Sequence, residues 1–205
     1  MTRTPFRMNQ LPLTCETALK EWAVAIEALG QGRMALIIRK GGIREDNNRF
    51  EVRFPEFLLF PSFEHQQSDL LRPEHASELI DALNGAPDEG HLTFSHFAKV
   101  HSTFRVTELA ELESLTPYHI WTQQYAETRL RWRPRVPLTA MVLRVYKLHE
   151  PQQVPVHPEY AGCKSWIPLL DTVAINVLEP VMSDGDFEAE AAAIDKAMAT
   201  SKALA

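Results

Sequence analysis

Apolar residues recur along the chain at two spacings, which predict helices in some segments and strands in others. Steps of three and four residues are typical of an amphipathic helix. They predict four helices: one over 15–29 capped by Thr14, one from Pro73 to the stop at Asn84 and Gly85, one from Thr116 and Pro117 to about Trp132, and one capped by Ser183. The buried face of the last helix is expected to hold Phe187, Ala191, Ile194 and Met198.

Strands are predicted where β-branched and aromatic residues gather between turn residues. The expected strands cover 34–39, 49–53, 56–60, 92–106 and 138–148, and a further one passes through Val173, Ile175 and Val177. Segment 138–148 is apolar on both alternating faces, which favours an interior strand, and a proline-rich loop is expected over 150–158. The pattern predicts an α+β fold with a mixed, mainly antiparallel sheet and about four helices packed on it. We expect a single domain over 1–205, and residues 85–91 are where a subdomain boundary would fall.

Two polar clusters follow predicted strands and are the best candidates for a binding site. They are Arg39, Lys40, Gly41, Gly42 and Arg44, and then Glu64, His65 and Gln66. If the preceding strands pair in a hairpin around Gly41, both clusters lie at one end of the sheet. The cations can neutralise a phosphate or carboxylate, and the glycines let the backbone approach a ligand closely. The alternative is a glycine turn with solvated charges, and the spacing fits neither a Walker A loop nor the dinucleotide fingerprint.

Catalytic roles are predicted for two groups of residues. Glu64 and His65 can act as general acid and base if burial shifts their pKa values, although successive strand residues point to opposite faces. In the structural alternative Glu64 pairs with Arg144, itself a candidate buried cation of the ligand site. Cys163 beside Lys164 can act as a nucleophile, with His157 as its base. The alternative there is a small buried thiol.

The arginines and histidines suggest two further sites. Arginines at 129, 131, 133 and 135 surround Trp132, as in patches that bind phosphates and stack bases; arginines that extend over a buried Trp132 explain the pattern equally well. His96 and His101 are five residues apart, which places them on opposite faces of a regular strand. No other histidine or cysteine spacing matches a standard metal site, so we predict neither a metal nor a cofactor.

Composition limits the function classes without naming one. The chain has 205 residues, 45% hydrophobic and 23% charged, and its net charge of -6 gives no overall attraction to nucleic acid or an anionic membrane. Two cysteines are too few for a disulfide framework. The first 13 residues lack the apolar region of an export signal, and the longest apolar run, around Met141–Val145, is too short to span a bilayer. We therefore expect a cytoplasmic protein that does not enter the membrane.

Several segments together resemble a known family. They are Glu21 to Ala23, Leu36 to Glu45, Phe57 to Gln66, His119 to Trp121, Arg133 to Leu138, Leu143 to Leu148 and Gly162 to Trp166. This combination resembles the bacterial family "domain of unknown function 1802" over nearly the whole chain. The resemblance implies one full-length unit in a bacterium, and no activity, substrate or cofactor.

Three functional hypotheses follow, and they leave open whether the chain is an enzyme. The first is a protein that binds or processes an anionic ligand, a nucleotide or nucleic acid, between the Arg39–Glu45 turn and Glu64–Gln66. The second is a metal-independent hydrolase or transferase that uses Glu64 and His65, or Cys163. The third is an interaction protein whose motifs form only turns and core. The geometry of Arg39, Lys40, Glu64 and His65 discriminates between them, because the first two hypotheses need one shared cavity.

Overall fold

The structure is a computed structural model that describes residues 13–40, 50–64, 66–84, 90–175 and 177–204. Within these residues the strands are β1 (Thr14–Trp22), β2 (Leu36–Arg39), β3 (Glu56–Ser62), β4 (His91–Val106), β5 (Leu138–Pro155), β6 (Trp166–Ala174) and β7 (Leu178–Pro180). The α-helices are α1 (Ala23–Gly30), α2 (Ala76–Asn84), α3 (Leu109–Ser114), α4 (Gln123–Arg131) and α5 (Asp184–Leu204). Short 3-10 turns occupy Ser68–Leu70, Pro73–His75, Thr116–Tyr118 and Pro158–Tyr160.

All seven strands form one mixed sheet, which confirms the predicted α+β class. The strand order is β2-β5-β4-β3-β1-β6, with β7 added to β5. Every pairing is antiparallel except that of β1 with β3. The strand that begins at Leu138 lies between β2 and β4, so it is interior as predicted. No helix among the described residues is long and apolar enough to cross a membrane. The single-domain assignment stays a prediction.

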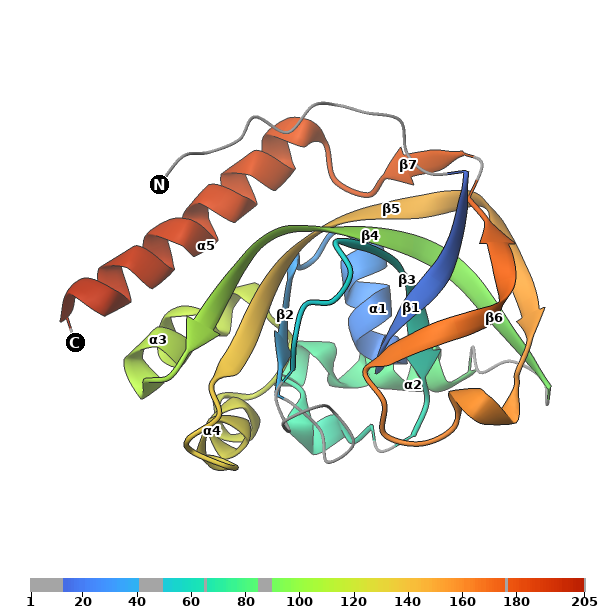
Figure 1. Ribbon diagram of the computed structural model, residues 1–205. Coiled ribbons are helices and arrows are strands. Elements are labelled where there is room, and N and C mark those ends of the chain that lie inside the picture. The colour runs from blue at the N-terminus through green and yellow to red at the C-terminus, as the bar shows by residue number, and fades with distance from the viewer. Residues whose placement is uncertain (1–12, 41–49, 65, 85–89, 176, 205) are drawn as a thin grey trace.

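The sheet curls around helix α1. Strands β4 and β5 run side by side for most of their length and arch over α1, while α5 and β7 lie on the other side of the arch (Figure 1). Two register shifts interrupt the β4–β5 ladder, between Phe94 and His96 and between Val100 and Ser102. Such bulges bend a strand and increase its twist. The curl brings the two ends of the strand order toward each other, and this shape creates the cavity described below.

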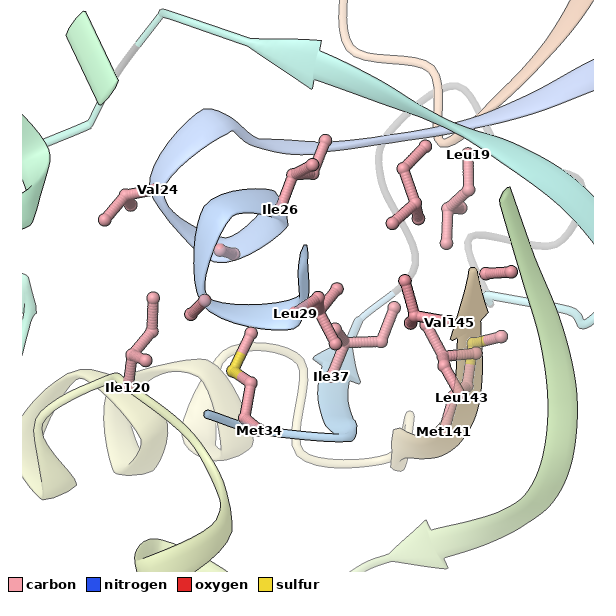
Figure 2. Close-up of a cluster of buried hydrophobic side chains, with 14 of the residues drawn as sticks. Leu19, Val24, Ile26, Leu29, Met34, Ile37, Ile120, Met141, Leu143 and Val145 are labelled. Atoms are coloured by element: carbon pink, nitrogen blue, oxygen red, sulfur yellow. The ribbon is translucent and has the colours of Figure 1, made fainter. Parts of the chain in front are cut away.

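A large apolar core fills the concave side of the arch. Figure 2 shows α1 packed over β2 and β5, with Leu29 facing Ile37 and Leu143 nearby. Successive residues of β3 serve different cores, because Leu59 belongs to this inner cluster while Leu58 belongs to a second cluster beneath β6. Both faces of the sheet are therefore covered, and burial of this apolar area is the main force that stabilises the fold.

Helix α5 covers the outer side of the sheet, and its buried face is the predicted one. Its buried apolar residues are Phe187, Ala191, Ile194 and Met198, which pack with Leu36, Val106 and Val142. The Ser183 hydroxyl accepts a 3.1 Å hydrogen bond from the backbone N–H of Asp186, which confirms the predicted N-cap.

The prediction of a helix from residue 15 is wrong, because residues 14–22 form β1. This strand is buried on both faces near its end, where Ala18 packs in one core and Leu19 in another. A strand buried on both faces shows no simple alternation. The apolar residues of β1 and α1 together recur at spacings of three and four residues. This periodicity is that of one continuous helix, which explains the wrong prediction.

The predicted hairpin around Gly41 is also wrong. Strand β2 pairs with β5, and β3 pairs with β1 and β4, so β2 and β3 are not neighbours in the sheet. Residues 50–55 form no strand, although 49–53 was predicted as one; residue 49 lies outside the described residues. Glycine and polar turn residues favour a local hairpin, but they carry no information about pairing with a strand far along the chain, such as that of β2 with β5.

Three smaller boundaries differ from prediction. The third predicted helix starts later than expected. A 3-10 turn lies at its expected start, and α4 begins only after Thr122, whose hydroxyl accepts a hydrogen bond from the backbone N–H of Tyr125. The short helix α3, before this turn, was not predicted. The expected loop 150–158 is largely strand, because β5 continues to Pro155 beside β4. Of the stretch expected as one strand, Val173 lies in β6, whereas Ile175 and Val177 lie in no strand and β7 begins only at Leu178; β6 and β7 join different parts of the sheet.

Candidate functional site

A cavity of about 480 Å³ lies where strands β1, β2 and β3 end. Helix α4, the turn before Leu71 and the loop before β6 supply the remaining walls. The described residues that line it are Lys20, Glu21, Trp22, Ile38, Arg39, Lys40, Ser62, Leu70, Trp121, Tyr125, Ala126, Arg129, Trp132, Cys163, Lys164 and Ser165. They come from six separate segments, so only the folded sheet brings them together.

An ion pair between Arg39 and Glu21 closes one wall of the cavity. Arg39 Nη1 donates to Glu21 Oε2 at 2.9 Å, and Arg39 Nη2 donates to Ser165 Oγ at 2.8 Å. Glu21 is only 5% exposed, and its other oxygen accepts from the backbone N–H of Trp22 at 2.8 Å. These contacts join β2 to β1 and to the loop before β6. A carboxylate held in this way balances the charge of Arg39.

Lys40 and Arg129 form a second, unbalanced group of charges. Lys40 is 3% exposed, and its Nζ donates to the backbone carbonyl of Leu130 at 2.6 Å. Burial lowers the pKa of Lys40, and the neighbouring charge of Arg129 lowers it further. Within the described part of the chain, Arg129 has no carboxylate partner and contacts the Trp132 ring at 5.7 Å. Two cations therefore repel each other at this wall of the cavity.

Lys20 and Lys164 hold the loop that forms the opposite wall. Lys20 Nζ donates to the carbonyls of Tyr160 at 2.6 Å and Gly162 at 3.1 Å, and Lys164 Nζ donates to that of Glu159 at 3.0 Å. Burial lowers the pKa of Lys20, while the charge of Glu64 acts in the opposite direction. The loop is thus tied down by the same cations that face the cavity.

Aromatic rings form much of the remaining surface. Trp22 and Tyr125 stack with ring centroids 5.7 Å apart and planes inclined by 27°. Trp132 is 38% exposed, and the guanidinium of Arg133 lies 4.6 Å from its ring centre. Arg133 has a φ of 53°, in the left-handed region that residues with a side chain rarely adopt. This backbone bend turns the chain from α4 toward β5 and leaves the Trp132 ring at the cavity rim.

The chemistry of the lining is strongly one-sided. Among the described residues of the lining, five cationic side chains face a single carboxylate, Glu21, and four aromatic side chains accompany them. Such a surface attracts anions and offers flat apolar faces for a ring.

The structure places the predicted ligand residues unequally. Arg39 and Lys40 line the cavity. Gly41, Gly42, Arg44 and His65 lie outside the described residues. Glu64 is exposed and close enough to influence Lys20, but it does not line the cavity.

Gln66 and Arg144 are engaged elsewhere in the fold. Gln66 Oε1 accepts from the backbone N–H of Val24 at 3.1 Å, and its Nε2 donates to the Ser62 carbonyl at 2.9 Å, which ties the start of α1 to the end of β3. Arg144 is buried as predicted, but its carboxylate partner is Asp184 at 2.6 Å rather than Glu64. It lies against Phe187 of α5 and does not line the cavity.

The nucleophile hypothesis is only partly supported by the geometry. Cys163 is exposed and lines the cavity, so the alternative of a buried thiol is wrong. His157, its predicted base, instead has Nε2 2.8 Å from Asp171 Oδ2. Of the basic patch, Arg129 lines the cavity, whereas Arg131 is exposed and pairs with Glu127.

The histidines that suggested a metal lie apart. His96 packs against Gly30 of α1, while the His101 ring contacts Phe187 of α5, so the two lie on opposite sides of the sheet. Among the described residues, no group of three or more histidine, cysteine, aspartate or glutamate side chains is arranged to hold a metal ion.

Lys20, Glu21 and Trp22 are site residues that the sequence analysis did not single out. They occupy the end of β1, which was assigned to a helix, and no local pattern marks them as facing Arg39. The usable signal was the family resemblance, since its segments include both Glu21 to Ala23 and Gly162 to Trp166.

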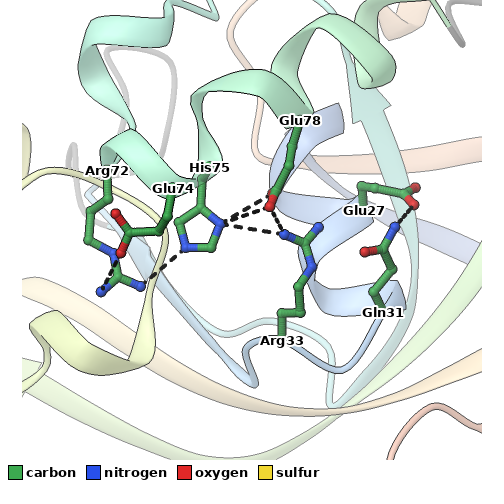
Figure 3. Close-up of polar contacts among 7 residues, drawn as sticks. All are labelled: Glu27, Gln31, Arg33, Arg72, Glu74, His75 and Glu78. Carbon is green, nitrogen blue, oxygen red and sulfur yellow. Dashed lines mark hydrogen bonds and ion pairs between the residues drawn. The ribbon is translucent and has the colours of Figure 1, made fainter.

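A second cavity of about 750 Å³ lies beside helices α1 and α2, and its cation Arg33 is already paired. Arg33 forms an ion pair with Glu78, and Gln31 donates to Glu27. Figure 3 shows His75 beside Glu78, with Nδ1 3.1 Å from Glu78 Oε1. Burial alone would raise the pKa of Glu78, but hydrogen bonds from Arg33 and His75 outweigh it and lower that pKa. This network joins the two helices and uses Arg33, the one cation among the described lining residues, while the carboxylates of Glu27 and Asp81 leave this cavity acidic and therefore unsuited to an anion.

Comparison with known proteins gives one family and a few distant structures. No curated protein matches the chain significantly. Among solved structures, ASCH from Zymomonas mobilis aligns with 10% identity and a TM-score of 0.40, covering 86% of this chain and 93% of that one. A serine-to-alanine mutant of that protein aligns with 11% identity and a TM-score of 0.37, covering 89% and 98%. The model of one family matches residues 18–193. The chain therefore belongs to the family described as "Domain of unknown function (DUF1802)".

Proposed function

We propose that the protein binds an anionic ligand that carries an aromatic ring, a nucleotide or nucleic acid, in the cavity at the ends of β1, β2 and β3. The observation that carries this proposal is the described part of the lining, in which five cations and four aromatic side chains surround one carboxylate. The net charge of the whole chain is -6, so this excess of cations is local. A positively charged concave site raises the local concentration of anions even on an acidic protein.

Lys40 and Arg129 are the residues we expect to bind the anionic group. Their mutual repulsion is a cost in the free protein, and an anion between them would remove it. Lys40 Nζ uses one donor on the Leu130 carbonyl, so two N–H groups remain for a ligand. The guanidinium of Arg129 can bind a phosphate with two parallel hydrogen bonds.

Trp132 is the residue we expect to contact the ring of the ligand. It is the most exposed of the tryptophans in the lining. Stacking of a base on an aromatic side chain contributes about 1–3 kcal/mol per base and tolerates any base sequence. The proposal agrees with the cytoplasmic location expected from the sequence, because nucleotides and nucleic acid are abundant there.

Fluorescence anisotropy with labelled single-stranded oligonucleotides and a labelled nucleotide tests the proposal. Arg129→Gln should weaken binding about tenfold and reduce the salt dependence of oligonucleotide binding by about one phosphate contact. Arg131→Gln is the matched control, because it removes the same charge from the same helix outside the cavity. Equal effects of the two substitutions, or no binding by the unmodified protein, would contradict the proposal.

A further inference from the structure

We propose that the cavity recognises a terminal phosphomonoester, the phosphate of a free nucleotide or of a strand end, rather than the phosphodiester of a continuous strand. This inference rests on the proposed function and narrows its ligand. It depends on three features: the burial of Lys40, the charges of Lys40 and Arg129, and the space beside them.

The burial of Lys40 restricts which phosphates can reach it. Lys40 is 3% exposed, and its Nζ is fixed on the carbonyl of Leu130 inside the cavity wall. A phosphodiester carries a chain on both sides, so both chains would have to enter and leave past this wall. A terminal phosphate carries only one substituent and can enter with its free oxygens first.

Two other cations of the lining have carboxylate compensation that Lys40 and Arg129 lack. Arg39 is balanced by Glu21 at 2.9 Å, and the carboxylate of Glu64 acts on Lys20. Lys164, like Lys40, donates to a backbone carbonyl, but it is exposed on the loop before β6. Within the described residues, the only charge that acts noticeably on Lys40 is the like charge of Arg129. The anion of the ligand is therefore expected on the α4 side of the cavity.

The charge of a phosphomonoester matches this pair better than that of a diester. A monoester carries about -1.5 to -2 at pH 7 and three acceptor oxygens, because its second pKa is about 6. A diester carries a single negative charge and two unesterified oxygens. The two cations Lys40 and Arg129 are neutralised by a phosphomonoester but only half neutralised by a phosphodiester.

The volume of the cavity fits one nucleotide and not a run of them. About 480 Å³ lies in the range of sites that enclose one drug-sized molecule. A base on Trp132 and a phosphate between Lys40 and Arg129 would lie side by side at the C-terminal end of α4, where the Arg129 guanidinium is 5.7 Å from the Trp132 ring centre. Further nucleotides of a strand would lie outside the cavity.

Binding of three oligonucleotides of one sequence tests the inference: one with a 5′-phosphate, one with a 3′-phosphate and one with neither. We expect one phosphorylated form to bind about tenfold more tightly than the unphosphorylated form. The preference should decline as the pH falls below about 6, where the monoester becomes a monoanion. Arg129→Gln should reduce the preference, and Arg131→Gln should leave it intact.

Adenosine monophosphate and adenosine identify the source of the phosphate. Binding of the monophosphate as tight as that of the strand end indicates a free nucleotide as ligand, and much weaker binding indicates a strand end; either result supports the terminal phosphate. Equal binding of all three oligonucleotides would overturn the inference and leave the proposed function standing. Absence of binding to every nucleotide and oligonucleotide would overturn both.

Discussion

The guanidinium of Arg39 donates to the carboxylate of Glu21 at 2.9 Å, although their strands are separated by three others in the sheet. The contact exists because the sheet curls around α1 and brings the end of β2 to the end of β1. One ion pair therefore joins distant parts of the sheet and forms a wall of the cavity. Its contribution to stability can be measured.

Glu21→Gln should lower the free energy of unfolding by about 3 kcal/mol, because it leaves the partly buried charge of Arg39 without a counter-ion. Glu127→Gln is the control, since it breaks a pair with the exposed Arg131 and should cost about 0.5 kcal/mol or less. Urea denaturation measures both. Similar small losses for the two variants would show that the Arg39 pair has no special role.

Gly30→Ala should destabilise the protein by about 1–3 kcal/mol through overpacking. A Cβ at this position would clash with Nε2 of His96, and that buried ring is held by a 2.9 Å contact with Ser95. Gly185→Ala is the matched control, because the nearest atom to its Cβ is the Ser183 hydroxyl at 4.0 Å. That change should stabilise α5 slightly, as alanine generally does in a helix.

Thermal unfolding of the two glycine variants distinguishes packing from backbone effects. The double variant Gly30→Ala with His96→Ala should lose less stability than the two single changes predict together, because the smaller side chain removes the clash. Simple additivity in this pair would mean that the backbone at Gly30, and not the imidazole, sets the cost.

The sequence predicted those elements whose burial pattern is simple. Helix α5 has one buried face and a serine cap, so both its helical periodicity and its first residue could be predicted from the sequence. Strand β1 has apolar neighbours on both faces and joins α1 directly, so its periodicity indicated the wrong element. The hydrophobic periodicity of a segment identifies its buried face only when the opposite face is exposed to solvent.

The candidate site shows a similar limit. Arg39 and Lys40 were found because they follow an apolar strand, and they line the cavity. Their predicted neighbour Gln66 instead caps α1, while Glu21 and Arg129 come from other segments. Which polar residues meet depends on the order and curl of the strands, and the pairing of β2 with β5 spans a hundred residues that no local turn encodes.

Stability should fall in mild acid because of His119. Its side chain is 1% exposed, and neither ring nitrogen has a partner among the described residues. Burial, with a further contribution from the charge of Arg72, lowers the pKa of His119 from 6.5 to about 4. Between pH 6.5 and about 4, His119 is protonated in the unfolded chain but stays neutral in the folded protein. Stability is therefore complete above pH 6.5 and declines as the pH falls to about 4, by up to about 3 kcal/mol.

His119→Phe removes this titration and keeps an aromatic ring beside Trp121. The free energy of unfolding, measured by urea titration at several pH values, should then depend less on pH between 6.5 and 4. Burial also lowers the pKa of His96, but that residue is present in both proteins, so the difference isolates His119. Parallel curves for the two proteins would contradict the assignment.

The thiol of Cys163 should report occupation of the cavity. It is exposed and lines the cavity beside Lys164, whereas Cys15 is half-buried and burial raises its pKa. A thiol reagent should therefore modify Cys163 first, because only an accessible thiolate reacts readily. Saturating adenosine monophosphate should slow the modification of Cys163, and mass spectrometry of the digested protein follows each cysteine separately. Cys15 serves as the internal control, and its slow rate should not change. If the nucleotide binds but leaves the rate at Cys163 unaltered, the ligand lies elsewhere on the molecule and the cavity is not its site.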